Sequence, residues 1–426
     1  MNNNSKKISK CSFDDIKEYY NNVLNTDTTT FISSNDTPTP IECVEEMLSK
    51  LPEEFYKRDN LKVLDPCCGD GNFCVPLYYK FRECNFTHKN IIDNILYFND
   101  INEKRLENVK NIFGSKHISN LDYTNDYPED VKFDLILANP PYAKLMENGK
   151  RASKNHNLIS IFIEKTLKLL KPNGYLLFIT PDNWMSYASR NILIEKLTAL
   201  QIIHLDIHTA KKYFKKIGSS FTWYIIQNCK FSKDFTVSGI WKKVYYESLV
   251  TSQERKYIPL YYNKNIQSIL SKTIDNTKLK KFNVETSSYL HKYTKKELIN
   301  DTKTTVFKYK LIHTPKQTVY ASKPHIYQDG YKVFISTTDK YQVFIDDCGM
   351  TQSIVFIRCK TLKEAEEYSK ILNHPLYIFL NNICRWGNFN NIKILKSFPI
   401  PENNKDGDIF EYFKLTNGEI NLIQNT

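Results

Sequence analysis

The chain of 426 residues lacks long apolar runs. No segment approaches the roughly 20 consecutive apolar residues that a helix needs to cross a bilayer. The first residues, Met1 to Lys7, are polar and contain no apolar core of a signal peptide. The sequence therefore predicts no transmembrane segment, no signal peptide and a cytoplasmic location.

Cysteine pairs with metal-binding spacing are also missing. The chain has 10 cysteines, but they form no C-x-x-C motif and are scattered along the sequence. Scattered cysteines in a long chain are typical of a reduced intracellular protein rather than of a disulfide framework. We expect no metal cofactor, and no internal repeat or nuclease motif stands out in the sequence.

Glycine is scarce, with only 12 in the chain, yet two lie close together after an apolar segment. Gly69 and Gly71 follow a buried strand that ends on Asp65, and a helix is expected from about Asn72. A glycine turn between strand and helix lets the backbone approach a nucleotide-like ligand. The third glycine of the dinucleotide fingerprint G-x-G-x-x-G is absent. Asp65 and Asp70 would repel a pyrophosphate but suit an ammonium group, which points to S-adenosylmethionine (SAM).

A second segment presents groups that can hold an amino-bearing ring. Residues 133–138 read as an apolar strand that stops on Asn139-Pro140-Pro141-Tyr142. Two prolines cannot donate to a sheet ladder, so the strand must end there, and Pro140 keeps Asn139 extended. The resulting elbow offers one amide, backbone carbonyls and one aromatic ring. Alone, it fits a plain proline-rich turn equally well.

Acidic residues follow two further predicted strands. Asp100 ends a strand over residues 95–99, and it could accept ribose hydroxyls or cap the next helix. Asp122 and Tyr123 follow a strand from about residue 117, and the acid could accept from an adenine amino group. Strands and helices alternate from residue 61 to about 227, which predicts a mostly parallel, doubly wound sheet. All these candidates then lie at the carboxyl edge of that sheet.

Upstream, Thr39 reads as a helix N-cap with Pro40 at the first helical position. The helix N-terminus could hold a carboxylate beside the site, although an ordinary capped surface helix fits equally well. The alternating domain is expected over residues 1–245, with this motif helix at about 37–51.

Charge is uneven along the chain. Residues 1–150 carry 18 Lys+Arg against 24 Asp+Glu (−6), and residues 151–426 carry 41 against 23 (+18), which together give the net +12. A basic remainder favours a polyanionic partner. Residues 246–426 combine frequent tyrosine and lysine with short strand-like runs, which predicts a second, β-rich domain that contacts DNA or serves as a scaffold. A basic and aromatic cluster precedes it and could contact phosphates and bases or end a surface helix: Lys211, Lys212, Tyr213, Phe214, Lys215 and Lys216.

These motifs, in this order, resemble the gamma-class (TaqI-like) DNA adenine N6-methyltransferases over about residues 31–230. The resemblance implies an α/β Rossmann-like SAM-dependent methyltransferase fold with a doubly wound sheet, followed by an α+β, β-rich target-recognition domain. It implies cofactor contacts from Thr39, Pro40, Asp65, Gly69, Asp70, Gly71, Asp100, Ile101, Asp122, Tyr123 and Asn139. It implies catalysis by Asn139, Pro140 and Tyr142, and substrate contacts from Pro141, Tyr142, Phe221, Lys211, Lys212, Lys215 and Lys216. Phe221 is preferred over Trp223 and Tyr224 as the ring that stacks on the target base.

The activity that the resemblance implies is methyl transfer from SAM to N6 of a flipped-out adenine in double-stranded DNA, with S-adenosylhomocysteine as the product. We expect a monomeric modification enzyme of a restriction-modification-like system, and the sequence leaves open whether a separate cognate restriction endonuclease exists. RNA adenine N6-methyltransferases and protein glutamine N5-methyltransferases share the elbow and remain alternatives. The basic second domain counts against the glutamine enzymes, and cytosine N4 enzymes have Ser in place of Asn139.

Overall fold

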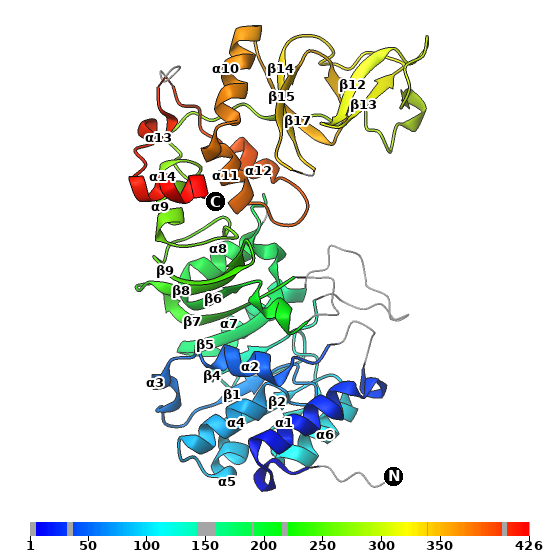
Figure 1. Ribbon diagram of the computed structural model, residues 1–426. Helices are drawn as coiled ribbons and strands as arrows, with labels where there is room; N and C mark the ends of the chain where they lie inside the picture. Colours follow the sequence, from blue (N-terminus) through cyan, green and yellow to red (C-terminus); the bar gives the residue numbers. More distant parts are fainter. Residues whose placement is uncertain are drawn as a thin grey trace. The chain divides into compact units, whose positions relative to one another are not determined.

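The computed structural model describes residues 6–31, 37–142, 158–189, 191–214, 220–338, 340–402 and 407–425. It divides into two compact units, Met1–Trp184 with Ile192–Arg255, and Met185–Asn191 with Lys256–Thr426 (Figure 1). The boundary differs from the expected one at residues 245 and 246. Strand β9, Val244–Val250, pairs with β8, Phe235–Trp241, so the sheet of the first unit continues beyond residue 245.

The first unit is built on a nine-stranded sheet with the order β3-β2-β1-β4-β5-β7-β6-β8-β9. The strands from β3 to β5 are parallel, and β7 runs antiparallel between β5 and β6. The remaining strand bounds are β1 Val63–Asp65, β2 Leu96–Asn99, β3 Ile118–Ser119, β4 Phe133–Ala138, β5 Leu170–Pro181, β6 Leu200–Ile207 and β7 Phe221–Lys230. The order reverses between β1 and β4, and this is where open α/β sheets bind ligands. The predicted doubly wound sheet is confirmed.

Helices cover this sheet and supply its core. They include α1 Phe13–Asn22, α2 Ile41–Leu48, α3 Glu53–Tyr56, α4 Cys74–Glu83, α5 His88–Asn90, α6 Glu103–Phe113, α7 Leu158–Leu169 and α8 Ile192–Thr198. Buried side chains of α1, α2, α4 and α6 form one cluster with alternate residues of the strands, such as Leu135 and Leu137 of β4. All six β4 residues are buried, because helices pack on both faces of a parallel sheet. This packing fixes the end of β4, from which Asn139 projects.

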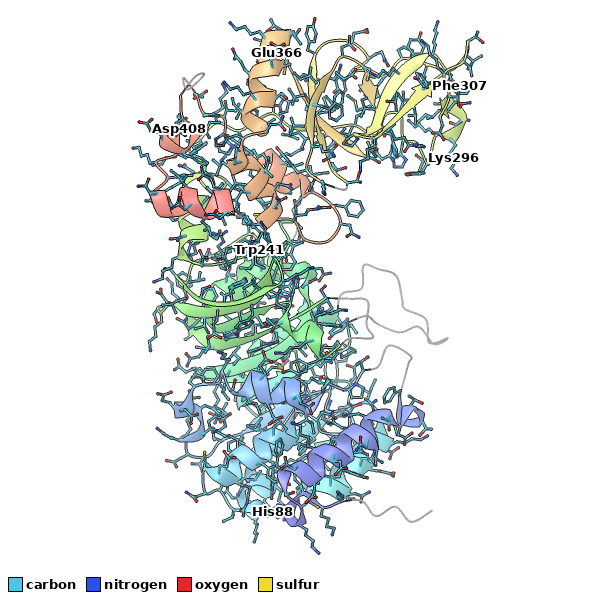
Figure 2. The ribbon with its side chains drawn as sticks, in the orientation of Figure 1. His88, Trp241, Lys296, Phe307, Glu366 and Asp408 are labelled. Carbon is cyan, nitrogen blue, oxygen red and sulfur yellow. The ribbon has the colours of Figure 1, made fainter. Side chains whose placement is uncertain are left out.

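The second unit is an α+β domain, as predicted. It contains two four-stranded sheets, β10-β17-β14-β15 and β11-β13-β12-β16. Their strands are β10 Glu285–Thr286, β11 Ile299–Asn300, β12 Tyr309–Thr314, β13 Gln317–Ala321, β14 Lys332–Ser336, β15 Val343–Asp346, β16 Gly349–Met350 and β17 Ile354–Arg358. Its helices are α9 Lys264–Lys272, α10 Leu362–Leu372, α11 Pro375–Ile383, α12 Ile392–Lys396, α13 Ile409–Tyr412 and α14 Asn417–Asn425. Figure 2 shows the side chains that these elements carry.

Within the described ranges, no helix is both long enough and apolar enough to cross a membrane. The same residues contain no cluster of three or more His, Cys, Asp or Glu side chains arranged to hold a metal ion.

Candidate active site

The turn after β1 depends on its two glycines. Gly69 and Gly71 have φ angles of 53° and 89°, which place both in a left-handed region that side chains disfavour. A Cβ atom on Gly71 would lie 2.8 Å from Cε2 of Phe113, and one on Gly69 would lie 3.1 Å from Nη1 of Arg105. The turn therefore needs glycine both for its conformation and for its close packing.

Asp65, the last residue of β1, is a buried carboxyl with an unused acceptor. The backbone N–H of Cys67 donates to its Oδ1 at 3.3 Å. Its Oδ2 is buried and has no hydrogen-bond partner among the described residues. Burial raises the pKa of Asp65 well above its usual value, because a desolvated carboxylate is costly. A cationic ligand group at Oδ2 would stabilise the ionised form.

Asp100, after β2, ties the second strand end to the glycine turn. Its Oδ2 accepts from the backbone N–H of Gly69 at 2.8 Å, and its Oδ1 accepts from that of Asn102 at 2.8 Å. A carboxylate oxygen can accept more than one hydrogen bond, so these contacts are compatible with ligand hydroxyls. The neighbouring Ile101 is 61% exposed and offers an apolar surface beside this acid.

The elbow after β4 is held by two hydrogen bonds of the Asn139 amide. Its Nδ2 donates to Oγ1 of Thr39 at 3.1 Å, and the hydroxyl of Tyr142 donates to its Oδ1. The expectation that Thr39 caps the next helix is wrong. Helix α2 begins at Ile41, with Pro40 at the N-cap and no side-chain cap bond, and the Thr39 hydroxyl accepts from Asn139 instead. Thr39 thus links the N-terminal motif directly to the elbow.

Tyr142 lies against Phe221, the first residue of β7. The two ring centroids are 5.9 Å apart, and Phe221 also packs on Phe214 at 5.0 Å. Trp223 is buried and stacks on His204 at 4.6 Å, so it serves the core. Of the three aromatic candidates for a base-stacking ring, Phe221 is the one that contacts Tyr142.

A small cavity of about 60 Å³ lies between the glycine turn and the elbow. It is lined by Thr37, Pro38, Thr39, Cys67, Cys68, Gly69, Asp70, Asn72, Phe73, Arg105 and Asn139. The fold therefore brings Thr39 of the N-terminal motif, Gly69 of the turn and Asn139 of the elbow together around one space.

Of the predicted cofactor residues, only Thr39, Gly69, Asp70 and Asn139 line this cavity. Asp122 and Tyr123, which are not among them, make their described contacts elsewhere. Both oxygens of Asp122 accept hydrogen bonds within its own turn, from Thr124 and Asn125 at 2.6 to 2.8 Å. Burial acts to raise its pKa, but these hydrogen bonds outweigh burial and lower it. Tyr123 is buried, with its hydroxyl 2.9 Å from Oγ1 of Thr166 on α7. In the described structure, Asp122 thus stabilises its own turn and Tyr123 packs in the core.

The basic cluster before β7 is described only in part. Lys211 and Lys212 end a short 3-10 helix, η6 (Thr209–Lys212), and Lys212 pairs with Glu46 of α2 at 2.6 Å. Lys215 and Lys216 lie outside the described residues.

Several residues at the site were not predicted from the sequence, and three of them are polar side chains that hold it together. Arg105 is 6% exposed, with Nε 3.8 Å from Oδ2 of Asp70 and its guanidinium 4.9 Å from the ring centroid of Phe31. Asn72 donates to the carbonyl of Thr39 at 2.9 Å. Tyr20 of α1 donates to the carbonyl of Asp70 at 2.6 Å. Spacing holds a signal for Arg105, because it shares a helical face with the buried Val109 and Ile112.

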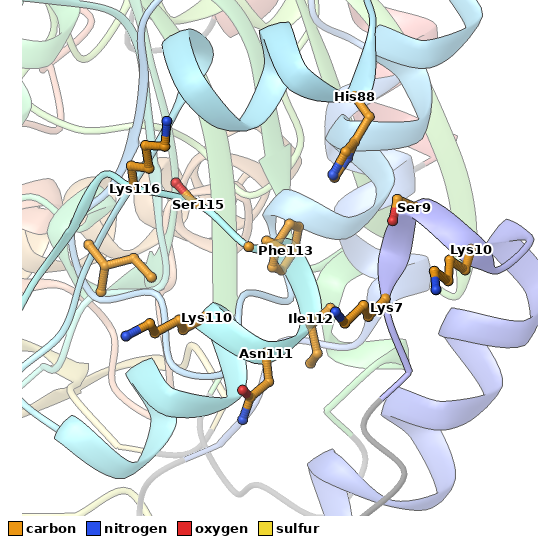
Figure 3. A pocket seen from close by; sticks show the side chains of 12 residues that line it. Lys7, Ser9, Lys10, His88, Lys110, Asn111, Ile112, Phe113, Ser115 and Lys116 are labelled. Atoms are coloured by element: carbon orange, nitrogen blue, oxygen red, sulfur yellow. The ribbon is translucent and has the colours of Figure 1, made fainter.

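A larger open cavity of about 890 Å³ lies away from this site (Figure 3). Its lining includes Lys7, Lys10, His88, Lys110 and Lys116. It adjoins the end of α6 and the beginning of β3, whereas the candidate site lies at the carboxyl ends of the strands. None of the predicted site residues lines it.

The strand order, the glycine turn after β1 and the elbow after β4 define a Rossmann-like methyltransferase fold. Residues 46–214 match the family model of the Eco57I restriction-modification methylase. The chain is thus a relative of the restriction-modification adenine methyltransferases, as its motifs predicted. Its placement in the gamma class stays a prediction.

Individual relatives agree with this match. The chain is 28% identical over 177 residues to the type II methyltransferase M.VspI of Vibrio sp. (strain 343). This match covers 39% of this chain and 42% of the relative. It is 24% identical over 138 residues to the adenine-specific methyltransferase BrxX of Escherichia coli O9:H4 (strain HS). This second match covers 29% of this chain and 11% of the relative. The chain thus spans less than half of each relative's length.

One solved structure shares the fold over most of the chain. It is the type IIL restriction-modification enzyme MmeI in complex with DNA, with a TM-score of 0.50 and 11% identity. The alignment covers 89% of this chain and 64% of that chain, so the similarity in fold extends into the second unit.

Proposed function

We propose that this chain transfers a methyl group from SAM to N6 of an adenine in double-stranded DNA. One observation carries the proposal. The amide of Asn139 is held at the carboxyl end of β4, beside the cavity formed by the glycine turn, and two aromatic rings lie next to it. The restriction-modification and adenine-specific relatives support this assignment.

The residues around the glycine turn fit the methionine and ribose parts of SAM. The unpartnered Oδ2 of Asp65 suits an ammonium group, and the glycine turn lines the cavity through Gly69. Asp100 lies where a strand-end acid accepts ribose hydroxyls. Bound SAM would supply an activated methyl group on its sulfonium. The chain itself would only bind and orient it.

The elbow then prepares the acceptor nitrogen. The lone pair of adenine N6 is delocalised into the ring, which makes the amino group a poor nucleophile. Oδ1 of Asn139 and the carbonyl of Pro140 would accept its two N–H groups and favour a pyramidal nitrogen with a localised lone pair. Such fixed acceptors act most strongly when they are preorganised away from water. The Tyr142 and Phe221 rings would stack on the extruded base and offset part of its unstacking cost.

The two alternatives place a similar planar nitrogen against the same acceptors. An RNA adenine enzyme would use the same residues, and a protein glutamine enzyme would present an amide. The net charge of +18 over residues 151–426 favours a polyanionic substrate over a protein. The DNA-bound state of MmeI is consistent with DNA. A monomeric state and a separate cognate endonuclease remain part of the proposal.

One assay separates these substrates. Purified protein with labelled SAM is offered duplex DNA, structured RNA and a release-factor-like protein in parallel. We expect label in DNA only. Label in RNA or protein, with none in DNA, would replace the proposed substrate and leave the methyltransferase assignment intact.

A further inference from the structure

The loop between α11 and α12 holds an exposed aromatic ring on a firmly anchored backbone. This loop, Arg385–Asn391, presents Phe389, which is 63% exposed. A single exposed apolar residue is ordinary on a protein surface. What sets Phe389 apart is how tightly the residues on both sides of it are held.

The residue after Phe389 is anchored to the sheet of the second unit. Asn390 is 2% exposed, and its backbone N–H donates to the carbonyl of Thr337 at 2.9 Å. Its Nδ2 donates to the carbonyl of Ser336 at 2.9 Å, and its Oδ1 accepts from Nδ2 of Asn381 at 3.0 Å. Phe389 itself forms an isolated antiparallel bridge with Thr338. The backbone beneath the ring is therefore fixed.

The residues before Phe389 are anchored as well. Nη2 of Arg385 donates to the carbonyl of Asn388 at 2.9 Å, which closes the loop on itself. Nε1 of Trp386 donates to the carbonyl of Ile258 at 2.8 Å. Gly387 has a φ of 73°, a left-handed conformation that turns the chain toward the tip. These contacts fix the backbone on both sides of Phe389 and leave its ring exposed to solvent.

The surrounding sequence is basic and free of acids. No Asp or Glu occurs from residue 368 to residue 401, and this stretch contains Lys370, Arg385, Lys393 and Lys396. An exposed ring within a basic stretch of sequence suits nucleic acid, since bases stack on aromatic faces and phosphates pair with lysine and arginine. A ring fixed in advance also loses little conformational freedom when it binds.

We propose that Phe389 is an apolar wedge that inserts between stacked base pairs of the duplex DNA bound by the second unit. Arg385 and Lys393 contact phosphates beside the insertion. Inserted phenylalanines of this kind unstack one base step and kink the duplex. The inference rests on the proposed function only in taking DNA as the substrate. It adds a specific base-step contact to the recognition domain.

The test uses the full chain and duplexes that carry 2-aminopurine at one position at a time. This base brightens when a neighbouring base is unstacked. With the wild-type protein we expect one base step to brighten in addition to the position of the extruded target adenine. With Phe389→Ala we expect that brightening to disappear and DNA affinity to fall about tenfold. Phe389→Trp should retain both.

Matched controls separate insertion from general surface effects. Tyr293, in the same unit, is 60% exposed and lies outside the loop, so Tyr293→Ala should leave the brightening at the wedge step unchanged. Gly387→Ala strains the left-handed backbone although its Cβ has open space, whereas Gly387→Asn tolerates that conformation better. We expect the signal to weaken in the alanine variant and to persist in the asparagine variant.

The outcomes are decisive in both directions. Unchanged brightening and affinity in a folded Phe389→Ala protein would overturn the wedge. The same result would leave the proposed function standing, provided that this variant still methylates DNA. A wild-type protein that methylates no DNA would overturn the proposed function itself, independently of any effect at Phe389.

Discussion

The rings of Tyr142 and Phe221 touch, with centroids 5.9 Å apart and planes inclined by 41°. A base held between two rings needs a van der Waals contact of about 3.5–4.0 Å on each side, or roughly 7–8 Å in all. The observed spacing leaves no room for a base. Tyr142 also donates its hydroxyl to Oδ1 of Asn139, the acceptor that the proposed mechanism needs. For a base to bind between them as proposed, the two rings would have to separate.

Replacing Tyr142 by phenylalanine removes the hydroxyl that occupies the Asn139 oxygen and keeps the stacking ring. We expect Tyr142→Phe to retain the methylation rate within about threefold and to bind a target-position 2-aminopurine duplex at least as tightly. Tyr142→Ala should lose about 10- to 100-fold in rate, because base stacking is lost. Single-turnover methylation separates the two variants. A phenylalanine variant as defective as the alanine variant would mean that the hydroxyl itself is needed.

Removing the amide at the elbow should stop the chemistry and spare the cofactor. We expect Asn139→Ala to lower the single-turnover rate by about 100- to 1000-fold, the range for the loss of one preorganised hydrogen-bonding group. Calorimetric SAM affinity should change little, because the Asp65 and Asp100 contacts remain. Asn111→Ala, an exposed change on α6, is the matched control. A fully active Asn139→Ala protein would rule out the elbow as the acceptor clamp.

We expect the Asp65 carboxylate to lower the stability of the ligand-free protein and to raise its affinity for SAM. Its pKa in the folded chain lies well above the usual 3.8, so its stabilising contribution is present below that value and lost as pH rises through the folded pKa. Asp65→Asn stays neutral, and we expect its unfolding temperature at pH 7.5 to exceed that of the wild type without ligand. The gain should fade toward pH 4. SAM affinity should fall at least tenfold, since an amide cannot balance the ammonium charge.

Two measurements check these opposite effects of Asp65 on stability and on SAM affinity. Thermal unfolding across pH 4 to 8 tests the stability, and calorimetry tests the affinity. Loss of stability in Asp65→Asn at pH 7.5 would show that Asp65 is satisfied in the native protein and is not held ready for a cation.

Lys212 is paired with Glu46 at 2.6 Å, so its charge is partly used within the protein. We expect Glu46→Gln to free this lysine for phosphates and to tighten DNA binding about two- to fivefold at low salt, in line with the small energy of an exposed ion pair. The gain should shrink as salt rises. Binding isotherms at several salt concentrations measure it. Unchanged affinity at every salt concentration would remove Lys212 from the DNA contacts.

Much of the catalytic unit followed from local pattern. The strand before Asn139, Phe133–Ala138, was predicted with its observed bounds, because two prolines end a buried apolar strand abruptly. The contact between Thr39 and Asn139 was not predicted. The two residues are far apart in sequence, and Thr39 reads locally as a helix cap. Only the folded sheet shows that its hydroxyl is already used by the amide.

Other contacts could not be predicted for a similar reason. Thr124 and Asn125 donate to the oxygens of Asp122, which depends on turn geometry, and the role of Asp122 toward a cofactor stays a prediction. The hairpin of β8 and β9 was missed because its exposed strand, Val244–Val250, alternates without a clear apolar face. Buried polar residues such as Arg105 are placed by tertiary packing, which periodicity shows only in part.

The central claim is that the elbow directs a methyl group to adenine N6. The most direct measurement is mass spectrometry of nucleosides released from duplex DNA after incubation with the protein and SAM, alongside the Asn139→Ala variant. The account predicts N6-methyladenine with the wild type, formed about 100- to 1000-fold more slowly by the variant. Methylated cytosine, or N6-methyladenine formed equally by both proteins, would contradict it.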